Sequence, residues 1–233
     1  MEFGHDSVAR IVYASESNVQ GSVYAELERI RESALKHNVP LGVYTALLYQ
    51  SGWFVQWKEG PVDAVLKLTD RIAADPRHHN LRIVHSSRGP RLLSGPWSMA
   101  IVDAREDPGA MAERVEWAHR CAVDGRQYPL PAVWRHLSTP HGGAAQPGEI
   151  DRFQRIMVCG SETRDAFELV QWLGRRFDRP VVHRRFAGEE GLDVGTDYVD
   201  FDDEGRAYRV IAMARNGLLL PLTRAFVSDY SRI

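Results

Sequence analysis

The stretch "WFVQWKEGP", residues 53–61, combines an apolar strand pattern with one side chain that does not fit it. Its aromatic and β-branched residues are typical of a strand buried on both faces, yet Gln56 stands in the middle. A neutral amide has two donor hydrogens and two acceptor lone pairs, and burying it unpaired costs about 1–3 kcal/mol. The stretch therefore predicts a central strand and a hydrogen-bond partner for Gln56.

The residues around this strand alternate between strand and helix patterns. A β-type run at 9–15 is followed by an amphipathic helix pattern at 22–38, and Pro40 then stops the helix. "LGVYTALLY" and "GWFVQWKEG" are two strands joined by the tight-turn signal "QSG", and a second helix pattern begins at Pro61. "LRIVHS" and "WSMAIVD" follow as strands. The expected order is β-α-β-β-α-β-β over about residues 8–103.

This order indicates an α+β, ferredoxin-like fold with both helices on one face of the sheet. The strand at 53–58 has apolar residues at both odd and even positions, so apolar side chains point to both faces of the sheet. The second face must therefore be covered as well. "DPGAMAERVEWAHRCAV" and "PLPAVWRHL" are helical patterns that supply this cover. We therefore expect one domain over residues 1–137, with two covering helices at its end.

A second domain is expected in the remainder of the chain. "STPHGGAAQPGE" is small and rich in glycine and proline, which indicates a linker at 138–150. "QRIMVCG" then reads as a strand and "SETRDAFELVQWLGRRF" as a helix. "VVHRRF" and the strands that follow it contain hairpin turns at "DDEG" and "RNG", and "AFVSDY" closes the chain. Residues 151–233 are therefore expected to form a small α+β domain for output or interaction.

Composition narrows the class of function. The net charge is −2 with acids and bases interspersed, which argues against nucleic-acid binding. No apolar stretch has the length of a membrane span, and the N-terminus is unlike a signal peptide. Cys121 and Cys159 lack CxxC spacing, and no nucleophile has a base at recognisable spacing. We expect a cytoplasmic protein that binds neither nucleic acid nor membrane and is not an enzyme.

The first half of the chain carries a set of residues that together resemble a known family. They are Tyr13 in "RIVYAS", His37 and Asn38 in "KHN", Gln56 in "FVQWKEGP", Arg77 and His78 in "DPRH", and Trp97 and Met99 in "WSM". This set, in this order and with near-family spacing, resembles that of the BLUF domains, which are flavin-binding blue-light sensors. The resemblance covers about residues 8–103 and implies FAD as the cofactor.

The alternation of side chains along strands supports a shared site. Phe54, Gln56 and Lys58 share one face of their strand. In a ferredoxin-like sheet the first strand lies beside the third, so Tyr13 and Gln56 can project into one layer between the sheet and the two helices. A flat flavin ring in that layer would offer acceptors to the amide of Gln56.

The resemblance also implies a role for each residue. It places His37 and Asn38 at the edge of the flavin ring, and Arg77 and His78 beside ribityl and phosphate oxygens. It makes Tyr13 the electron donor, and Gln56 the group that passes the proton and then rotates or tautomerises. Trp97 and Met99 would pass the rewired hydrogen bonding to the covering helices, and residues 151–233 to an unidentified partner protein.

Three residues depart from the family pattern. Tyr44 and Thr45 stand where the family has threonine and glycine, and Ala34 replaces a serine one turn before the asparagine. A flavin-free interaction module, in which Tyr44 and Thr45 fill the place of the chromophore, is therefore the alternative function. A flavoenzyme is the third and least favoured function, because the resemblance implies that Gln56 occupies the reactive edge of the flavin and leaves it closed to a substrate. Exposed faces of the sheet and the covering helices also leave room for a homo-oligomer.

Overall fold

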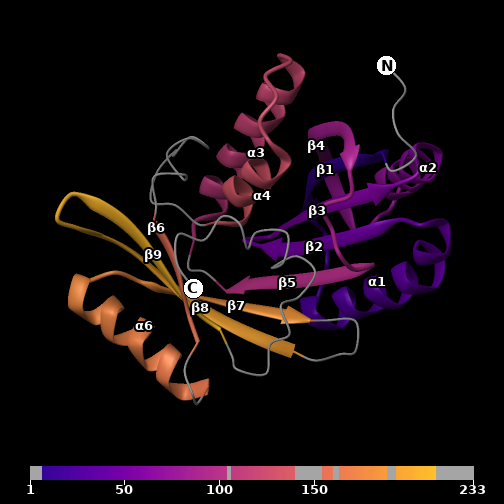
Figure 1. Ribbon diagram of the computed structural model, residues 1–233. Helices are drawn as coiled ribbons and strands as arrows, with labels where there is room; N and C mark the ends of the chain where they lie inside the picture. The colour runs from indigo at the N-terminus through magenta and orange to yellow at the C-terminus, as the bar shows by residue number, and fades with distance from the viewer. Residues whose placement is uncertain (1–6, 104–105, 140–153, 160–162, 188–192, 214–233) are drawn as a thin grey trace.

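The computed structural model describes residues 7–103, 106–139, 154–159, 163–187 and 193–213 (Figure 1). Its first half contains β1 (Ser7–Ser17), α1 (Val23–His37), a short 3-10 helix η1 (Val39–Leu41), β2 (Tyr44–Gln50), β3 (Trp53–Gly60), α2 (Val62–Ala73), β4 (His78–Pro90) and β5 (Trp97–Asp103). Two further helices follow, α3 (Pro108–Val123) and α4 (Leu130–Ser138). The predicted α+β order, with its covering helices, is confirmed.

The second half adds β6 (Gln154–Val158), α6 (Thr163–Phe177), β7 (Val181–Ala187), β8 (Asp193–Asp203) and β9 (Arg206–Met213). The turn expected at "DDEG" joins β8 to β9, with Glu204 and Gly205 both at positive φ. The turn expected at "RNG" and the strand expected at "AFVSDY" lie outside the described residues, as does most of the expected linker. The division into two domains stays a prediction.

All the described strands belong to one sheet, in the order β4-β1-β3-β2-β5-β7-β8-β9-β6. β1 pairs antiparallel with β3, as a ferredoxin-like fold requires, and β2 pairs parallel with β5. β5 also pairs antiparallel with β7, from Met99↔Ala187 to Asp103↔His183. Backbone hydrogen bonds therefore run directly from the first half of the chain to the second.

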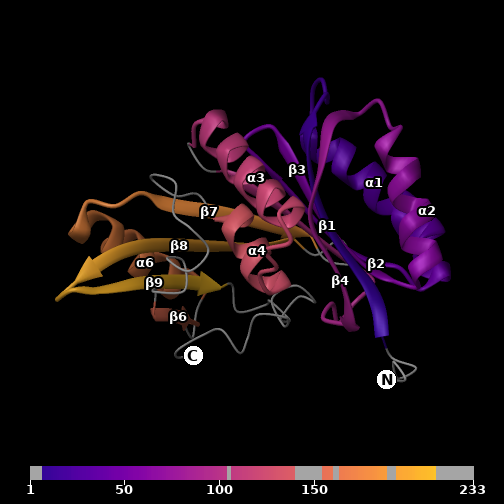
Figure 2. The ribbon, with the colours of Figure 1, turned by 90° about the horizontal axis from the view of Figure 1, so that it is seen from above.

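Helices cover both faces of the first half of the sheet (Figure 2). α1 and α2 lie on one face, and α3 and α4 lie on the other. Every residue of β3 is buried, which confirms that this strand is covered on both sides. Trp53, Val55 and Trp57 belong to the apolar cluster that includes residues of α3 and α4, whereas Phe54 packs with α1.

The hairpin of β2 and β3 fixes the position of Gln56. Its turn has Ser51 at φ 49° and Gly52 at φ 82°, and two positive values are the signature of the tight turn whose twist matches that of the strands. The turn sets the register that places Leu47 opposite Gln56. A slip of one residue would move Gln56 to the other face of the sheet.

The close approach of Gly60 to the start of β2 generates a stability prediction. A Cβ at Gly60 would lie 2.9 Å from Cγ2 of Val43, 3.0 Å from its Cα and 3.1 Å from the carbonyl oxygen of Gly42. Gly60→Ala is expected to lower the free energy of unfolding by about 1–3 kcal/mol, because backbone atoms must move. Chemical denaturation measures this, with Gly195→Ala as the control, since the nearest atom there is 4.0 Å away. Equal losses in both variants would contradict the prediction.

Candidate functional site

Tyr13 and Gln56 meet in the layer between the sheet and the helices α1 and α2. They stand directly opposite each other on β1 and β3, so their side chains project from the same face. The hydroxyl of Tyr13 donates a hydrogen bond of 2.8 Å to Oε1 of Gln56. Both residues are buried, and burial raises the pKa of the Tyr13 hydroxyl, which keeps it protonated at neutral pH. Within the described part of the chain, the amide nitrogen of Gln56 has no hydrogen-bond partner.

These two residues occupy a polar strip between two apolar clusters. One cluster includes residues of α1, β2 and β5, and its buried members are Leu27, Ala34, Leu47, Phe54, Trp97 and Met99. The other includes residues of α2 and β1, and its buried members are Ala9, Ile11, Val43, Val65 and Leu68. β3 runs between β1 and β2, so its side chains Gln56 and Lys58 lie between the two clusters. A ligand that enters between α1 and α2 would meet this polar strip.

A small cavity of about 40 Å³ opens at the strip. It is lined by Tyr13, Ile30, Leu47, Phe54, Gln56, Ile72, Asp75, Arg77 and His78. Four of the residues predicted for the site, Tyr13, Gln56, Arg77 and His78, are thus brought together here. The cavity is well below the roughly 300–1,000 Å³ of typical ligand pockets. A flavin-sized group therefore fits only if the side chains of α1 and α2 that line it move outward.

Arg77 and His78 lie at this cavity, but in different ways. Arg77 precedes β4 and is paired with Asp75 and, at 3.1 Å, with Oε1 of Glu26 on α1. His78 is the first residue of β4 rather than a loop residue, since β4 begins earlier than the sequence predicts. Its ring stacks against that of Tyr13 with 6.4 Å between centroids, and burial lowers its pKa. His78 therefore presents a neutral ring next to Tyr13 at neutral pH.

Asn38 and His37 lie at the end of α1, away from the lining of the cavity. Asn38 is buried and caps the helix, and its carbonyl oxygen accepts hydrogen bonds from the backbone N–H groups of Leu41 and Val43. His37 is exposed to solvent. The structure thus places Asn38 in the interior, but it does not bring His37 together with the other predicted site residues.

Trp97 and Met99 face the same layer from β5. Met99 pairs with Leu47 and Trp97 pairs with Thr45, and both side chains are fully buried. β2 therefore separates these two residues from Gln56. The indole nitrogen of Trp97 has no hydrogen-bond partner among the described residues.

Tyr44 does not fill the layer under α1 and α2, which corrects one expectation drawn from the sequence. Because side chains alternate along β2, Tyr44 projects to the opposite face. There it packs against the cluster under α3 and α4, and the guanidinium of Arg91 lies 3.9 Å from the centre of its ring. Thr45 does face the layer, directly opposite Lys58.

Lys58 is the residue whose importance the sequence did not reveal. Its side chain is fully buried, its Nζ lies 4.6 Å from the centre of the Tyr13 ring, and no described residue accepts a hydrogen bond from that nitrogen. Burial holds the pKa of Lys58 well below its usual range, and the nearby Arg71 lowers it further. The available signal was a charged residue on the same face as Gln56 in a largely apolar strand.

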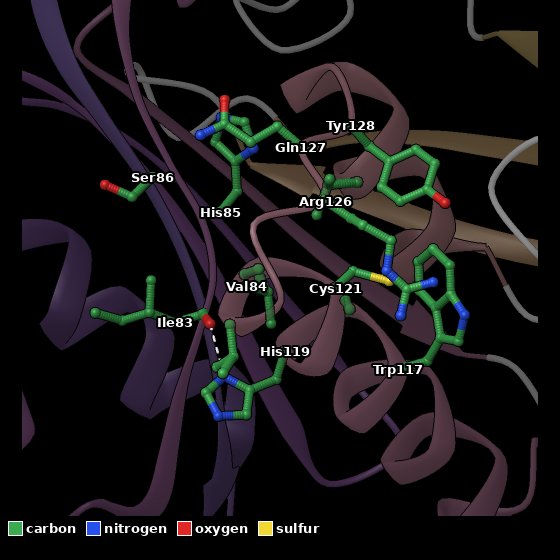
Figure 3. Close-up of a pocket in the computed structure, with 14 residues that line it drawn as sticks. Ile83, Val84, His85, Ser86, Trp117, His119, Cys121, Arg126, Gln127 and Tyr128 are labelled. Carbon is green, nitrogen blue, oxygen red and sulfur yellow. Dashed lines mark hydrogen bonds between the residues drawn. The ribbon is translucent and has the colours of Figure 1, made fainter.

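A larger cavity of about 310 Å³ lies between β4 and α3, on the face opposite the Tyr13–Gln56 pair. Figure 3 shows Trp117, Arg126 and Tyr128 along one side of it. On the other side, Nδ1 of His119 makes a hydrogen bond of 2.8 Å with the carbonyl oxygen of Ile83. None of the site residues predicted from the sequence lines this cavity.

The first half of the chain is thus a ferredoxin-like sheet with a buried Tyr–Gln pair, and comparison with known proteins shows what this part resembles. Residues 8–100 match the model of the BLUF family, described as sensors of blue-light using FAD. These residues are therefore a BLUF domain, and domains of this family bind a flavin.

Parts of two curated relatives and of a solved structure are also similar to this chain. The photoactivated adenylate cyclase subunit beta of Euglena longa is 35% identical over 82 residues, which are 35% of this chain and 9% of that protein. The subunit of the same name from Euglena gracilis is 35% identical over 97 residues, 41% of this chain and 11% of that protein. The chain thus spans about a tenth of the length of these relatives. The dark-state structure of BlrB, a BLUF protein, is 22% identical, with a TM-score of 0.38 over 57% of this chain and 93% of that one.

The described helices include none that is both long enough and apolar enough to cross a membrane. The described residues likewise contain no group of His, Cys, Asp and Glu side chains placed to hold a metal ion.

The buried amine of Lys58 generates a pH-dependence prediction for the flavin-free protein. Burial lowers the pKa of this amine in the folded state, whereas in the unfolded state the amine stays charged up to a pH of about 10.4. Between the lowered pKa and that pH the unfolded chain binds more protons, so stability rises with pH. Lys58→Met is expected to flatten this rise by up to about 1.4 kcal/mol per pH unit and to stabilise the protein at pH 7.

Denaturant titrations between about pH 7.5 and 9.5 measure this slope, a window chosen to lie between the ordinary pKa values of histidine and tyrosine. The charged or titratable groups that face Lys58 are Tyr13, His78 and Arg71, and all are unchanged in the variant. Lys67→Met, on the exposed face of α2, is the control and should keep the slope of the unmodified protein. A steep slope that survives in Lys58→Met would contradict the prediction.

Proposed function

We propose that this chain is a blue-light receptor that binds FAD between the sheet and the helices α1 and α2. The observation that carries the proposal is the carboxamide of Gln56, which lines the cavity there. Its oxygen is held by Tyr13, and its nitrogen has no partner among the described residues. A ligand with acceptor atoms would satisfy that nitrogen, and the flavin ring offers such acceptors.

The residues of the layer fit a flavin in character. The strip offers donor groups between two apolar clusters, which suits a flat ring with polar atoms along its edges. We place Asn38 at the edge of the ring. Arg77 and His78 would contact the ribityl and phosphate oxygens at the mouth of the cavity, once Arg77 releases Asp75 and Glu26.

A bound flavin supplies absorption of blue light and one-electron chemistry. Tyr13 is the residue that would give up an electron to the photoexcited flavin, and its hydroxyl proton has a path to Gln56 along the 2.8 Å hydrogen bond. Both would return to Tyr13 as the switch completes, so no net oxidation results. Rotation of the carboxamide then exchanges its oxygen and its nitrogen. After rotation the nitrogen donates to the oxygen of Tyr13, and the carboxamide oxygen faces the layer. The two states of the switch are therefore the two orientations of this buried carboxamide, each with its own set of hydrogen bonds.

The structural change caused by rotation of Gln56 would be transmitted from the site through β5. This strand carries Trp97 and Met99 toward the layer, and its backbone is hydrogen-bonded to β7. The end of α4 provides a second connection, because Arg184 on β7 donates a hydrogen bond of 2.5 Å to the carbonyl oxygen of Ser138. Arg209 on β9 likewise donates to Thr139 at 3.1 Å.

We propose that the second half of the chain passes the signal to a partner protein in the cytoplasm by contact and not by catalysis.

Colour and its response to light test this function. Protein supplied with FAD is expected to be yellow and to show a small, reversible red shift of the flavin absorption under blue light. Tyr13→Phe and Gln56→Leu should abolish the shift, since each removes one side of the hydrogen bond. Tyr128→Phe should retain it, because that phenol lines the cavity on the opposite face of the sheet.

Failure of the protein to take up FAD would contradict the proposal and favour the flavin-free interaction module instead. A shift that is unaltered in Tyr13→Phe and Gln56→Leu would refute the switch while leaving flavin binding intact.

A further inference from the structure

A second polar row crosses the sheet next to the row that holds Tyr13 and Gln56. Lys58 on β3 stands directly opposite Thr45 on β2, and Thr45 stands opposite Trp97 on β5. Residues that are directly paired project from the same face, so all three side chains enter the layer under α1 and α2. The row lies two residues along β3 from Gln56.

All three side chains of this row end in a buried polar atom that lacks a partner. Nζ of Lys58, Oγ1 of Thr45 and Nε1 of Trp97 make no hydrogen bond within the described residues. The three residues are at most 1% exposed. Buried polar groups in native proteins are almost always hydrogen-bonded, so three such atoms in one row point to a partner that the chain itself does not supply.

The chemistry of the row indicates what that partner carries. An ammonium or amine, a hydroxyl and an indole N–H can all donate hydrogen bonds, and the indole can only donate. No described carboxylate pairs with Lys58. Its Nζ lies 4.6 Å from the centroid of the Tyr13 ring, a contact that supplies no hydrogen-bond acceptor. The missing group is therefore rich in acceptors and lies deep in the layer.

We propose that Lys58, Thr45 and Trp97 form a row of donors that binds acceptor atoms of the flavin ring, with Lys58 as the largest contributor of the three. This inference rests on the proposed function, because it takes the ligand of the layer to be a flavin. The depth of the row selects the ring over the phosphates. Lys58, Thr45 and Trp97 are buried, whereas Arg77 at the cavity is about two-fifths exposed.

The row also connects binding to the switch. Lys58 touches the ring of Tyr13 and would at the same time hold the ligand on which Tyr13 acts. Trp97 would bond the ligand directly, so that β5 follows any shift of the ring. A hydrogen bond from Trp97 thus gives this buried residue a part in signalling that packing alone does not.

Equilibrium titration of riboflavin, FMN and FAD into the flavin-free full chain, followed by quenching of flavin fluorescence, tests the row. Lys58→Met is expected to weaken the binding of all three flavins by about tenfold, because a buried acceptor of the ring would be left without its donor. Thr45→Val keeps the shape of the side chain, and Trp97→Phe keeps an aromatic ring while removing the indole N–H. Each should cost about two- to tenfold. Lys67→Met on the exposed face of α2 is the control and should bind as the unmodified chain does.

The stability of the same flavin-free variants separates a role in binding from a role in folding. Lys58→Met should bind flavin more weakly and yet unfold at a higher denaturant concentration, because it removes a buried amine. A fall in both quantities would assign Lys58 a structural role and overturn the inference.

The remaining outcomes are also decisive. Unchanged binding in Lys58→Met by a chain that still binds flavin would overturn the donor row and leave the receptor function standing. Losses confined to FMN and FAD would place Lys58 at the phosphates and overturn the contact with the ring. An unmodified chain that binds none of the three flavins would overturn the proposed function together with this inference.

Discussion

The hydrogen bond between Tyr13 and Gln56 is the constraint on which the site depends. It requires β1 to lie beside β3, in the register that puts these two residues opposite each other. It also requires β3 to be central, because only a strand covered on both faces keeps such a bond away from water. The hairpin turn at Ser51 and Gly52 fixes the register of β3 against its other neighbour, β2, and the two pairs of helices provide the cover.

Neighbouring residues of β3 connect the helix layers on the two faces of the sheet. Gln56 faces α1 and α2, and the next residue, Trp57, packs against Trp134 of α4 with 5.8 Å between ring centroids. Glu59 then accepts hydrogen bonds from the backbone N–H groups of Leu92 and Leu93, which anchors the segment between β4 and β5. A rearrangement at Gln56 thus begins on a strand that is tied to α4 and, through Glu59, to the approach to β5.

The sequence predicted the parts of this arrangement that follow from local patterns. Alternation along strands put Gln56 and Lys58 on one face, and the β-α-β-β-α-β order put Tyr13 beside Gln56, because the ferredoxin-like topology leaves few other pairings. The pairing of β5 with β7 was not predicted, since the contact of two strands some 80 residues apart has no local signal. The face of the sheet to which Tyr44 points could have been predicted. Side chains alternate along β2, so Tyr44 points away from the face that carries Thr45 and Leu47.

The role of Lys58 was beyond the sequence for a different reason. A lysine in an apolar strand is ordinarily paired with a carboxylate or reaches water with its end, and only the packed structure shows that neither holds here. His37 shows the converse case. Its neighbour Asn38 is buried while His37 is exposed, because adjacent residues at the end of a helix point in different directions.

The side-chain amide of Gln56 reports most directly on the proposed switch. Nuclear magnetic resonance of the 15N-labelled full chain can follow its two proton resonances, assigned by their absence in Gln56→Leu. We expect these resonances to shift when FAD is added in the dark, and to shift again, reversibly, under blue light. Resonances that FAD leaves in place, or that light leaves unchanged in the FAD-bound protein, would contradict the assignment of Gln56 as the switch.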